Sequence, residues 1–289
     1  MFSGATTLAA VIGDPVRHSL SPVIHNAAFS ACSLDWVYCA FPVARGGASD
    51  ALAAMRTLGI AGYSVTMPHK ADVAAAVDEC TPSAAALGAV NCVINRGGYL
   101  IGDNTDGAGF LQGLAADVGF EAAGARCVVL GAGGAARAVI DALGRAGAAE
   151  VVVVNRSADA AARAAALPGV AGGVGRVGDA SAIAGADLVV NATSLGMHLD
   201  RSRGTGPAAE LPCDPELVAS SAVAVDLVYD PVETPWLQAL RSRNIRAFNG
   251  LSMLVHQAAG QFEWWTGHAA PVDAMREAVA RHLAERPAT

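Results

Sequence analysis

The chain has 289 residues, about twice the roughly 150 residues of a common single domain, so two domains are the first expectation. Hydrophobic residues make up 53% of the sequence and charged residues only 16%, which excludes an intrinsically disordered chain. The formal net charge is −7 and there is no basic run, so the expected partner is a small molecule, not nucleic acid and not a membrane surface.

Targeting signals and metal motifs are also missing from the sequence pattern. Every apolar stretch falls far short of the about 20 residues that cross a bilayer. Asp14 and Pro15 interrupt the first apolar run too early for a signal peptide, so a cytoplasmic protein is expected. The six cysteines form no CxxC pair, no metal site is predicted, and the thiols are expected to be small core residues: Cys32, Cys39, Cys80, Cys92, Cys127 and Cys213.

Short apolar runs alternate with longer Ala-rich stretches along almost the whole chain. This pattern is typical of βαβ units around a mostly parallel sheet, so the predicted fold class is α/β. Helices are expected between the strands, for example at residues 158–167 and 270–284. The Gly/Val-rich stretch from Gly172 to Gly178 is predicted to be only a connector. The predicted strands are residues 8–12, 36–41, 62–66, 90–95, 126–130, 150–154, 188–191 and 222–227.

A change in the sequence pattern near residue 106 predicts a domain boundary. The polar segment GDNTDGAGF precedes a helix-like stretch, after which Arg126 begins a new strand. Two helix-like segments, residues 250–265 and 271–283, end the chain and are expected to return to the first domain. The predicted domains are therefore residues 1–106 with 248–289, and residues 107–247.

The strand at residues 126–130 leads directly into a glycine-rich turn and a helix. The turn reads Gly131, Ala132, Gly133, Gly134, Ala135, Ala136, which is the G-x-G-x-x-A pattern of dinucleotide-binding folds. In that pattern the first glycine allows the tight turn and the second lets the backbone approach a pyrophosphate. A lone turn of this kind is weak evidence, but the strand that follows favours the dinucleotide.

The end of that following strand indicates which dinucleotide is preferred. Asn155, Arg156 and Ser157 stand about 20 residues beyond the glycines, where an NAD site usually places an acid. Arg156 offers a planar fork of donors suited to a 2′-phosphate, so NADP is favoured over NAD. A surface arginine is the alternative, and Asp159 nearby weakens the preference.

Four polar segments lie where predicted strands end or turn, at residues 13–22, 64–70, 88–91 and 103–107. They supply hydroxyls, an amide, an ammonium and a carboxylate, a set suited to holding a small polyhydroxylated acid and to proton transfer. Taken singly each has an ordinary explanation. Ser21 with Pro22 fits a helix N-cap, and Lys70 fits a solvated surface lysine.

Taken together, these segments resemble the shikimate dehydrogenase family, in order and spacing, over nearly the whole chain. The resemblance implies an N-terminal substrate domain with a mixed sheet, a Rossmann-like NADP domain, and C-terminal helices that return to the first domain. It also implies NADP-linked interconversion of 3-dehydroshikimate and shikimate, on the route to chorismate and aromatic amino acids, by a monomer or homodimer. The matching stretches are GDPVRHSLSPVIHN, GYSVTMPHK, GAVN, GDNTDGAGF, VLGAGGAARA, VVVVNRS, NATSLGM, DLVYDP and GLSMLVHQA.

The resemblance also assigns roles by motif position. Lys70 looks like the catalytic lysine and Asp106 like its partner, and in the reducing direction Lys70 would donate a proton while hydride reaches the ketone carbon. Ser19 and Ser21 match hydroxyls that hold the substrate carboxylate. The expected substrate-binding residues are Ser19, Ser21, Thr66, Lys70, Asn91, Asp106, Tyr229 and Gln257. The expected cofactor-binding residues are Gly131, Ala132, Gly133, Gly134, Ala135, Asn155, Arg156, Ser157, Leu227 and Gly250.

Some positions depart from the family's commoner pattern. Ser64 stands where Asn is frequent, Asn249 where Asp often precedes Gly250, and Ser252 where Gly is common. Ala160 stands where many NADP-preferring members carry a second arginine, so NAD use stays possible.

Two alternative functions therefore stay open. One is a quinate/shikimate dehydrogenase that uses NAD. The other is a non-catalytic NADP-binding sensor, against which the presence of both Lys70 and Asp106 argues.

Overall fold

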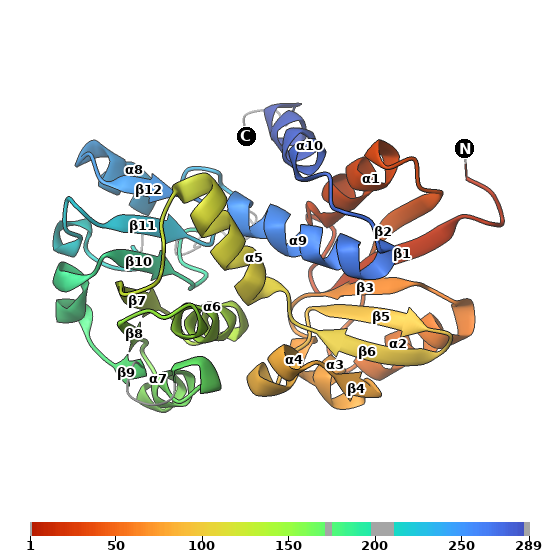
Figure 1. The fold of residues 1–289 in the computed structure, drawn as a ribbon, viewed down its shortest axis with the longest axis horizontal. Coiled ribbons are helices and arrows are strands. Elements are labelled where there is room, and N and C mark those ends of the chain that lie inside the picture. Colours follow the sequence, from red (N-terminus) through yellow and green to blue (C-terminus); the bar gives the residue numbers. More distant parts are fainter. Residues whose placement is uncertain (1, 171–174, 198–210, 286–289) are drawn as a thin grey trace. The chain divides into compact units, whose positions relative to one another are not determined.

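The structure is a computed structural model that describes residues 2–170, 175–197 and 211–285. The chain divides into two compact units, one of Met1–Thr105 with Val255–Thr289 and one of Asp106–Leu254. Each unit is built around a sheet of six strands (Figure 1). That one unit binds substrate and the other the dinucleotide stays a prediction.

The first unit contains a mixed sheet with the strand order β2-β1-β3-β5-β6-β4. Strand β1 pairs in parallel with β2 and β3, whereas β5 runs antiparallel to β3 and β6. This confirms the mixed sheet that the resemblance implied. The strands are β1 (Thr7–Gly13), β2 (Trp36–Pro42), β3 (Gly62–Val65), β4 (Glu79–Cys80), β5 (Cys92–Arg96) and β6 (Tyr99–Asp103).

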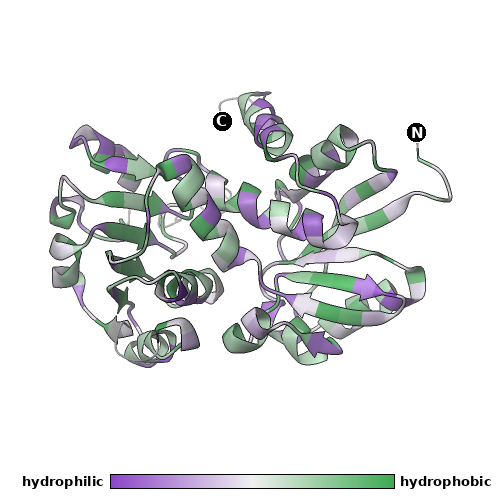
Figure 2. Cartoon of the chain, viewed as in Figure 1, coloured by the Kyte–Doolittle hydropathy of each residue, from purple (hydrophilic) through white to green (hydrophobic). Residues whose placement is uncertain are grey.

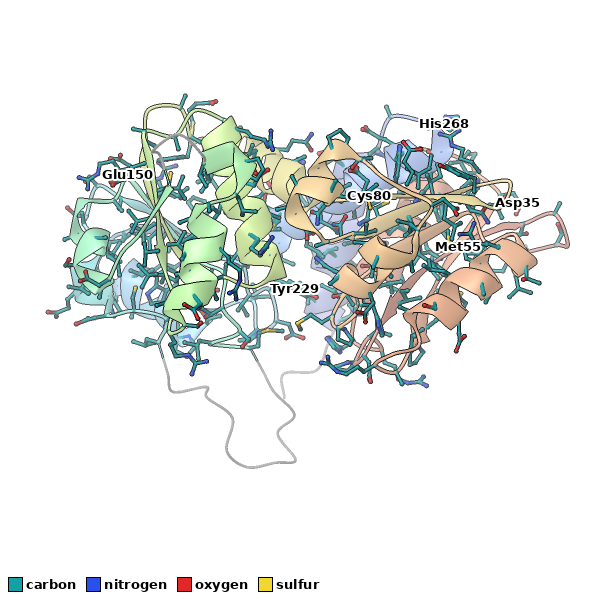
Figure 3. All side chains as sticks on the ribbon, turned by 90° about the horizontal axis from the view of Figure 1, so that it is seen from below. Asp35, Met55, Cys80, Glu150, Tyr229 and His268 are labelled. Atoms are coloured by element: carbon teal, nitrogen blue, oxygen red, sulfur yellow. The ribbon has the colours of Figure 1, made fainter. Side chains whose placement is uncertain are left out.

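Helices cover this sheet with apolar side chains. Met55 on α2 is fully buried in a core with Ile12 and Tyr63 (Figure 3). Helix α2 ends at Leu58 and is capped by Gly59, whose φ of 65° favours glycine. The C-terminal helices return to this unit as predicted, since α10 packs on α1. The helices are α1 (Ser21–Ala31), α2 (Ala48–Leu58), α3 (Lys70–Ala76), α4 (Pro82–Leu87), α9 (Leu251–Thr266, in this unit from residue 255) and α10 (Val272–Glu285).

The second unit contains a parallel sheet with the order β12-β11-β10-β7-β8-β9. Counted within this unit, the order is 6-5-4-1-2-3, which is that of a doubly wound dinucleotide-binding sheet with its switch point between β7 and β10. The strands are β7 (Arg126–Leu130), β8 (Glu150–Val154), β9 (Gly175–Val177), β10 (Leu188–Asn191), β11 (Val223–Asp226) and β12 (Arg246–Phe248).

Valine-rich strands explain why this sheet lies in the interior. Strands β10 and β11 are buried along their whole length, as expected when helices cover both faces of a parallel sheet. Figure 2 shows the hydrophobic colour along the strands of both sheets. The α-helices of this unit are α5 (Asp106–Gly113, continued by a π-helical turn at Leu114–Val118), α6 (Gly134–Arg145), α7 (Ala158–Ala165) and α8 (Pro235–Ser242).

All eight predicted strands are present, but β4, β6, β9 and β12 were not predicted. The prediction of a connector from Gly172 to Gly178 is wrong because β9 lies within it, although residues 172–174 fall outside the described residues. Strand β9 has three residues, too few to show a period that sequence patterning detects, and in the described ranges it pairs with β8 alone.

The prediction that the cysteines are core residues is correct only in part. Cys92 and Cys127 are buried, and burial raises the pKa of the Cys127 thiol to about 12, with Asp187 adding to the shift. The remaining cysteines are only partly buried, because their positions are not in the centre of either sheet: Cys32, Cys39, Cys80 and Cys213.

None of the helices within residues 2–170, 175–197 and 211–285 combines the length and apolar character that a membrane span requires.

Candidate active site

The two serines expected to hold a carboxylate lie together at the start of α1. The Ser19 hydroxyl donates to Ser21 Oγ at 3.1 Å, and the Ser21 backbone N–H donates to Ser19 Oγ at 3.2 Å. Leu20 occupies the cap position of α1 and Ser21 is its first residue, so the interpretation of Ser21 as the N-cap is wrong. The structure thus brings both hydroxyls to one place in the first unit.

Asn91 joins two of the predicted polar segments. Its Oδ1 accepts the backbone N–H of Thr105 at 2.8 Å, and its Nδ2 donates to Thr105 Oγ1 at 3.1 Å. Asn91 is only 2% exposed, so its amide is held by protein groups and not by bulk water. The same amide ties the GAVN segment to the DNTDG segment.

Gln257 approaches this pair from α9. Its backbone carbonyl accepts the Thr105 hydroxyl at 3.1 Å, and its Oε1 accepts Nε2 of Gln261 at 2.9 Å. Two of the predicted polar segments, 88–91 and 103–107, therefore meet Gln257 around Thr105, which the sequence did not single out as a site residue.

Backbone hydrogen bonds fix the turn from Thr66 to Lys70 at both of its ends. The Thr66 backbone N–H donates to the Ile12 carbonyl at 3.0 Å, and the Lys70 carbonyl accepts the Val90 N–H at 2.9 Å. Between them, His69 is fully buried with Nε2 2.7 Å from the Val43 carbonyl. Lys70 is the half-buried first residue of α3, so its backbone is fixed next to Thr66.

Asp106 and Tyr229 belong to the second unit. Asp106 is the first residue of α5 and is 6% exposed, and Tyr229 is half-buried in the segment after β11 (Figure 3). Because Lys70 lies in the first unit, its pairing with Asp106 stays a prediction.

The glycine-rich turn has the conformation that the dinucleotide pattern requires. Gly131 has a φ of 113°, and a Cβ atom there would lie 3.0 Å from the Ala192 carbonyl oxygen. Its N–H donates to the Val154 carbonyl at 2.8 Å, which closes the turn onto β8. The turn follows β7, at the switch point of the sheet, where ligands of such folds bind.

Helix α6 begins within this turn and can receive an anion. Gly133 is its N-cap, and among the described residues no atom beyond its own chain neighbours lies within 4 Å of a Cβ built there, so the backbone is open to a ligand. In the described part of the chain, no side chain caps the helix and no acid lies in its first turn. Its N–H groups and partial positive charge therefore fit the pyrophosphate of a dinucleotide.

The residues expected to bind a 2′-phosphate lie at the start of α7. Ser157 is the N-cap of this helix, since its Oγ accepts the Ala160 N–H at 3.3 Å, and Asn155 Nδ2 donates to the Ser157 carbonyl at 3.1 Å. Arg156 is exposed. The bonds of Asn155 and Ser157 fix the backbone on either side of the arginine.

Leu227 and Gly250, predicted beside the nicotinamide, are neighbours in the second unit. A Cβ atom on Gly250 would lie 2.1 Å from the Leu227 carbonyl oxygen, so only glycine fits. The Gly250 N–H donates to the Val228 carbonyl at 3.1 Å.

A buried hydrogen-bond network that the sequence motifs did not predict surrounds Asp226, next to Leu227. Asp226 Oδ1 accepts Asn191 Nδ2 at 2.8 Å, and its Oδ2 accepts the Thr234 hydroxyl at 2.7 Å. Burial raises the pKa of Asp226, and hydrogen bonds from Thr234, Val228 and Asn191 act against that shift. The sequence signal for this network was the pair of motifs NATS and DLVY. Each motif begins at the last residue of a strand, Asn191 in β10 and Asp226 in β11.

Among the described residues, no group of three or more His, Cys, Asp or Glu side chains is arranged to hold a metal ion.

The second unit has the sheet order and the glycine turn of dinucleotide-binding α/β proteins, and the first unit gathers hydroxyl and amide side chains and carries Lys70. Together these features define a two-domain dehydrogenase. Three family profiles match the chain: "Shikimate dehydrogenase substrate binding domain" at residues 11–93, "Shikimate / quinate 5-dehydrogenase" at residues 114–209, and "Shikimate 5'-dehydrogenase C-terminal domain" at residues 250–280.

Known proteins are similar over nearly the whole chain. The shikimate dehydrogenase (NADP(+)) of Moorella thermoacetica is 44% identical over 281 residues, which cover 94% of this chain and 92% of that protein. The chain therefore belongs to the shikimate dehydrogenase family.

Solved structures agree with this assignment. Shikimate 5-dehydrogenase from Thermus thermophilus, in complex with NADP(H) and shikimate, has a TM-score of 0.86 at 36% identity and covers 95% of this chain and 99% of its own. Quinate dehydrogenase from Corynebacterium glutamicum, in complex with NAD, has a TM-score of 0.85 at 31% identity and covers 96% and 99%.

Proposed function

We propose that this protein catalyses the NADP-dependent, reversible reduction of 3-dehydroshikimate to shikimate, in the biosynthesis of chorismate and aromatic amino acids. The observation that carries the proposal is the 44% identity with a shikimate dehydrogenase (NADP(+)) over 94% of the chain. The local geometry supports it, because Asn91 and Gln257, two of the residues expected to bind a polyhydroxylated acid, meet around Thr105.

The second unit binds the cofactor. The turn Gly131 to Ala135 and the start of α6 hold the pyrophosphate, and Asn155, Arg156 and Ser157 receive the 2′-phosphate. Leu227 and Gly250 lie beside the nicotinamide. NADPH bound there supplies the hydride that reaches the carbonyl carbon of the substrate.

The first unit binds the substrate and supplies the proton. Ser19 and Ser21 bind the carboxylate with their hydroxyls, and Thr66, Asn91 and Gln257 bind the ring substituents. Lys70 donates a proton to the carbonyl oxygen during reduction and takes one from the alcohol during oxidation. Asp106 pairs with Lys70, and Tyr229 contacts the ring.

Initial rates with four substrate pairs test this function: shikimate or quinate, each with NADP or NAD. The proposal expects shikimate with NADP to give the highest kcat/KM. Fastest turnover of quinate with NAD would instead make the protein a quinate dehydrogenase. Binding of NADPH without turnover of either alcohol would make it a sensor.

A further inference from the structure

A line of buried hydrogen bonds runs through the first unit toward Gln257. The Tyr38 hydroxyl donates to Ser64 Oγ at 2.5 Å, and the Ser64 hydroxyl donates to Gln261 Oε1 at 2.5 Å. Gln261 Nε2 then donates to Gln257 Oε1 at 2.9 Å. Tyr38, Ser64 and Gln261 are all buried, so these bonds do not compete with bulk water.

The donor-to-acceptor direction of these bonds sets the orientation of the Gln257 side-chain amide. Ser64 donates to the carbonyl oxygen of Gln261, so the amide nitrogen of Gln261 is the group turned toward Gln257. An amide nitrogen only donates, and Gln257 must therefore offer Oε1 to it. The Nε2 group of Gln257 then faces away from Gln261.

Further contacts hold Gln261 in this orientation. Its Nε2 lies 3.2 Å from the Asn91 carbonyl oxygen and 3.4 Å from Thr105 Oγ1. Gln261 follows Gln257 by four residues on α9, so the two side chains lie on one helix face. Gln261 thus joins β3, the Asn91 segment and the Thr105 segment to the helix that carries Gln257.

We propose that Gln261 is a positioning residue, which fixes the Gln257 amide so that its NH₂ group meets an oxygen atom of the bound substrate. The inference rests on the proposed function, in which Gln257 contacts the substrate. It adds the polarity of that contact: Gln257 is the donor, and the partner is a hydroxyl or carbonyl oxygen. Gln261 is itself 1% exposed, so it acts on the substrate through the side chain it orients and not by direct contact.

A role confined to anchoring α9 is the alternative explanation, and Trp265 offers a matched control for it. The Trp265 indole N–H donates to the Val93 carbonyl at 3.1 Å, so it ties the same helix to the same sheet through a bond in which Gln257 takes no part. Loss of this bond in Trp265→Phe weakens the anchor and leaves the glutamine pair intact.

The first experiment compares shikimate oxidation by Gln261→Met and Trp265→Phe at saturating NADP. For Gln261→Met we expect the KM for shikimate to rise about tenfold, as for the loss of one hydrogen bond, with kcat within threefold and NADPH affinity unchanged. For Trp265→Phe we expect a lower unfolding midpoint but a KM within twofold of the wild-type value. Gln261→Ala replaces Gln261→Met if the latter does not fold.

A double-mutant cycle with Gln257→Ala is the decisive step. If Gln261 acts through Gln257, Gln261→Met changes the KM less than twofold in the Gln257→Ala background, since no amide is left to orient. Additive effects, or an equal rise of KM in Trp265→Phe, would overturn the positioning role. These outcomes differ from failure of the proposed function, which would appear as a wild-type protein that does not oxidise shikimate.

Discussion

The imidazole of His25 stacks on the phenol ring of Tyr38, with ring centroids 4.4 Å apart and planes inclined by 17°. Trp265 covers the same imidazole at 5.1 Å. His25 is fully buried, and neither of its ring nitrogens has a hydrogen-bond partner within the part of the chain that the structure describes. The ring is therefore held as a neutral group in an apolar site.

The stability of the protein should depend on pH through His25. Burial lowers the pKa of His25 from 6.5 to about 3, and the nearby Gln261 side chain acts in the opposite sense. Below pH 6.5 the unfolded chain binds a proton that the folded chain does not. The free energy of unfolding should then fall by about 1.4 kcal/mol per pH unit until the pH approaches 3.

Urea unfolding between pH 7 and pH 4.5 measures this effect. In His25→Phe, the free energy of unfolding should depend on pH less steeply below pH 6.5, by about 1.4 kcal/mol per pH unit, which is the contribution of one proton. His268→Phe is the control and should keep the wild-type slope, because water reaches the His268 ring in both folded and unfolded chains. An unchanged slope in His25→Phe would show that His25 does not titrate on unfolding.

Gly62 should be intolerant of any side chain. A Cβ atom there would lie 2.5 Å from Trp265 Cε2, and the indole cannot move away easily because its N–H is bonded to the Val93 carbonyl. Gly62→Ala should therefore destabilise the protein by about 1 to 3 kcal/mol. Gly4→Ala is the matched control, since nothing lies within 4 Å of a Cβ at Gly4. Equal unfolding midpoints for the two variants would contradict the close contact.

Arg156 should set the preference for NADP over NAD. Loss of a hydrogen bond to a charged group costs about 1.5 to 3 kcal/mol, so Arg156→Ala should lower kcat/KM for NADP by about 10- to 100-fold. The value for NAD should change little, because NAD has no 2′-phosphate. Arg163→Ala, an exposed arginine later on α7, serves as the control. A parallel loss for both cofactors would place Arg156 outside the 2′-phosphate site.

Local signals in the sequence were enough for the four inner strands of the second sheet. The Val-rich runs predict β7, β8, β10 and β11, and the turn from Gly131 predicts the start of α6, because strand burial and glycine geometry act over a few residues. Strand β6 was missed even though Gly97 and Gly98, both with positive φ, join it to β5 as a two-residue hairpin loop. The Gly97-Gly98 pair is thus a local signal in the sequence for this hairpin.

The buried polar contacts of the first unit, in contrast, have no local signal in the sequence. Ser64 and Gln261 are 197 residues apart in sequence, and their hydrogen bond depends on how α9 docks on the first sheet. Nothing near either residue indicates the other. The motifs therefore predicted Asn91 and Gln257 individually but not Gln261, Thr105 or the Asp226 network that hold the predicted residues in place.

The turnover of Lys70→Ala tests the central claim, that the Lys70 amine transfers the proton, most directly. Removal of a general acid–base costs about 10²- to 10⁴-fold in rate, so kcat for shikimate oxidation should fall by at least 100-fold. The affinity for NADPH should stay within twofold, because the cofactor residues lie in the other unit. A kcat within threefold of the wild-type value, with the fold intact, would contradict the account.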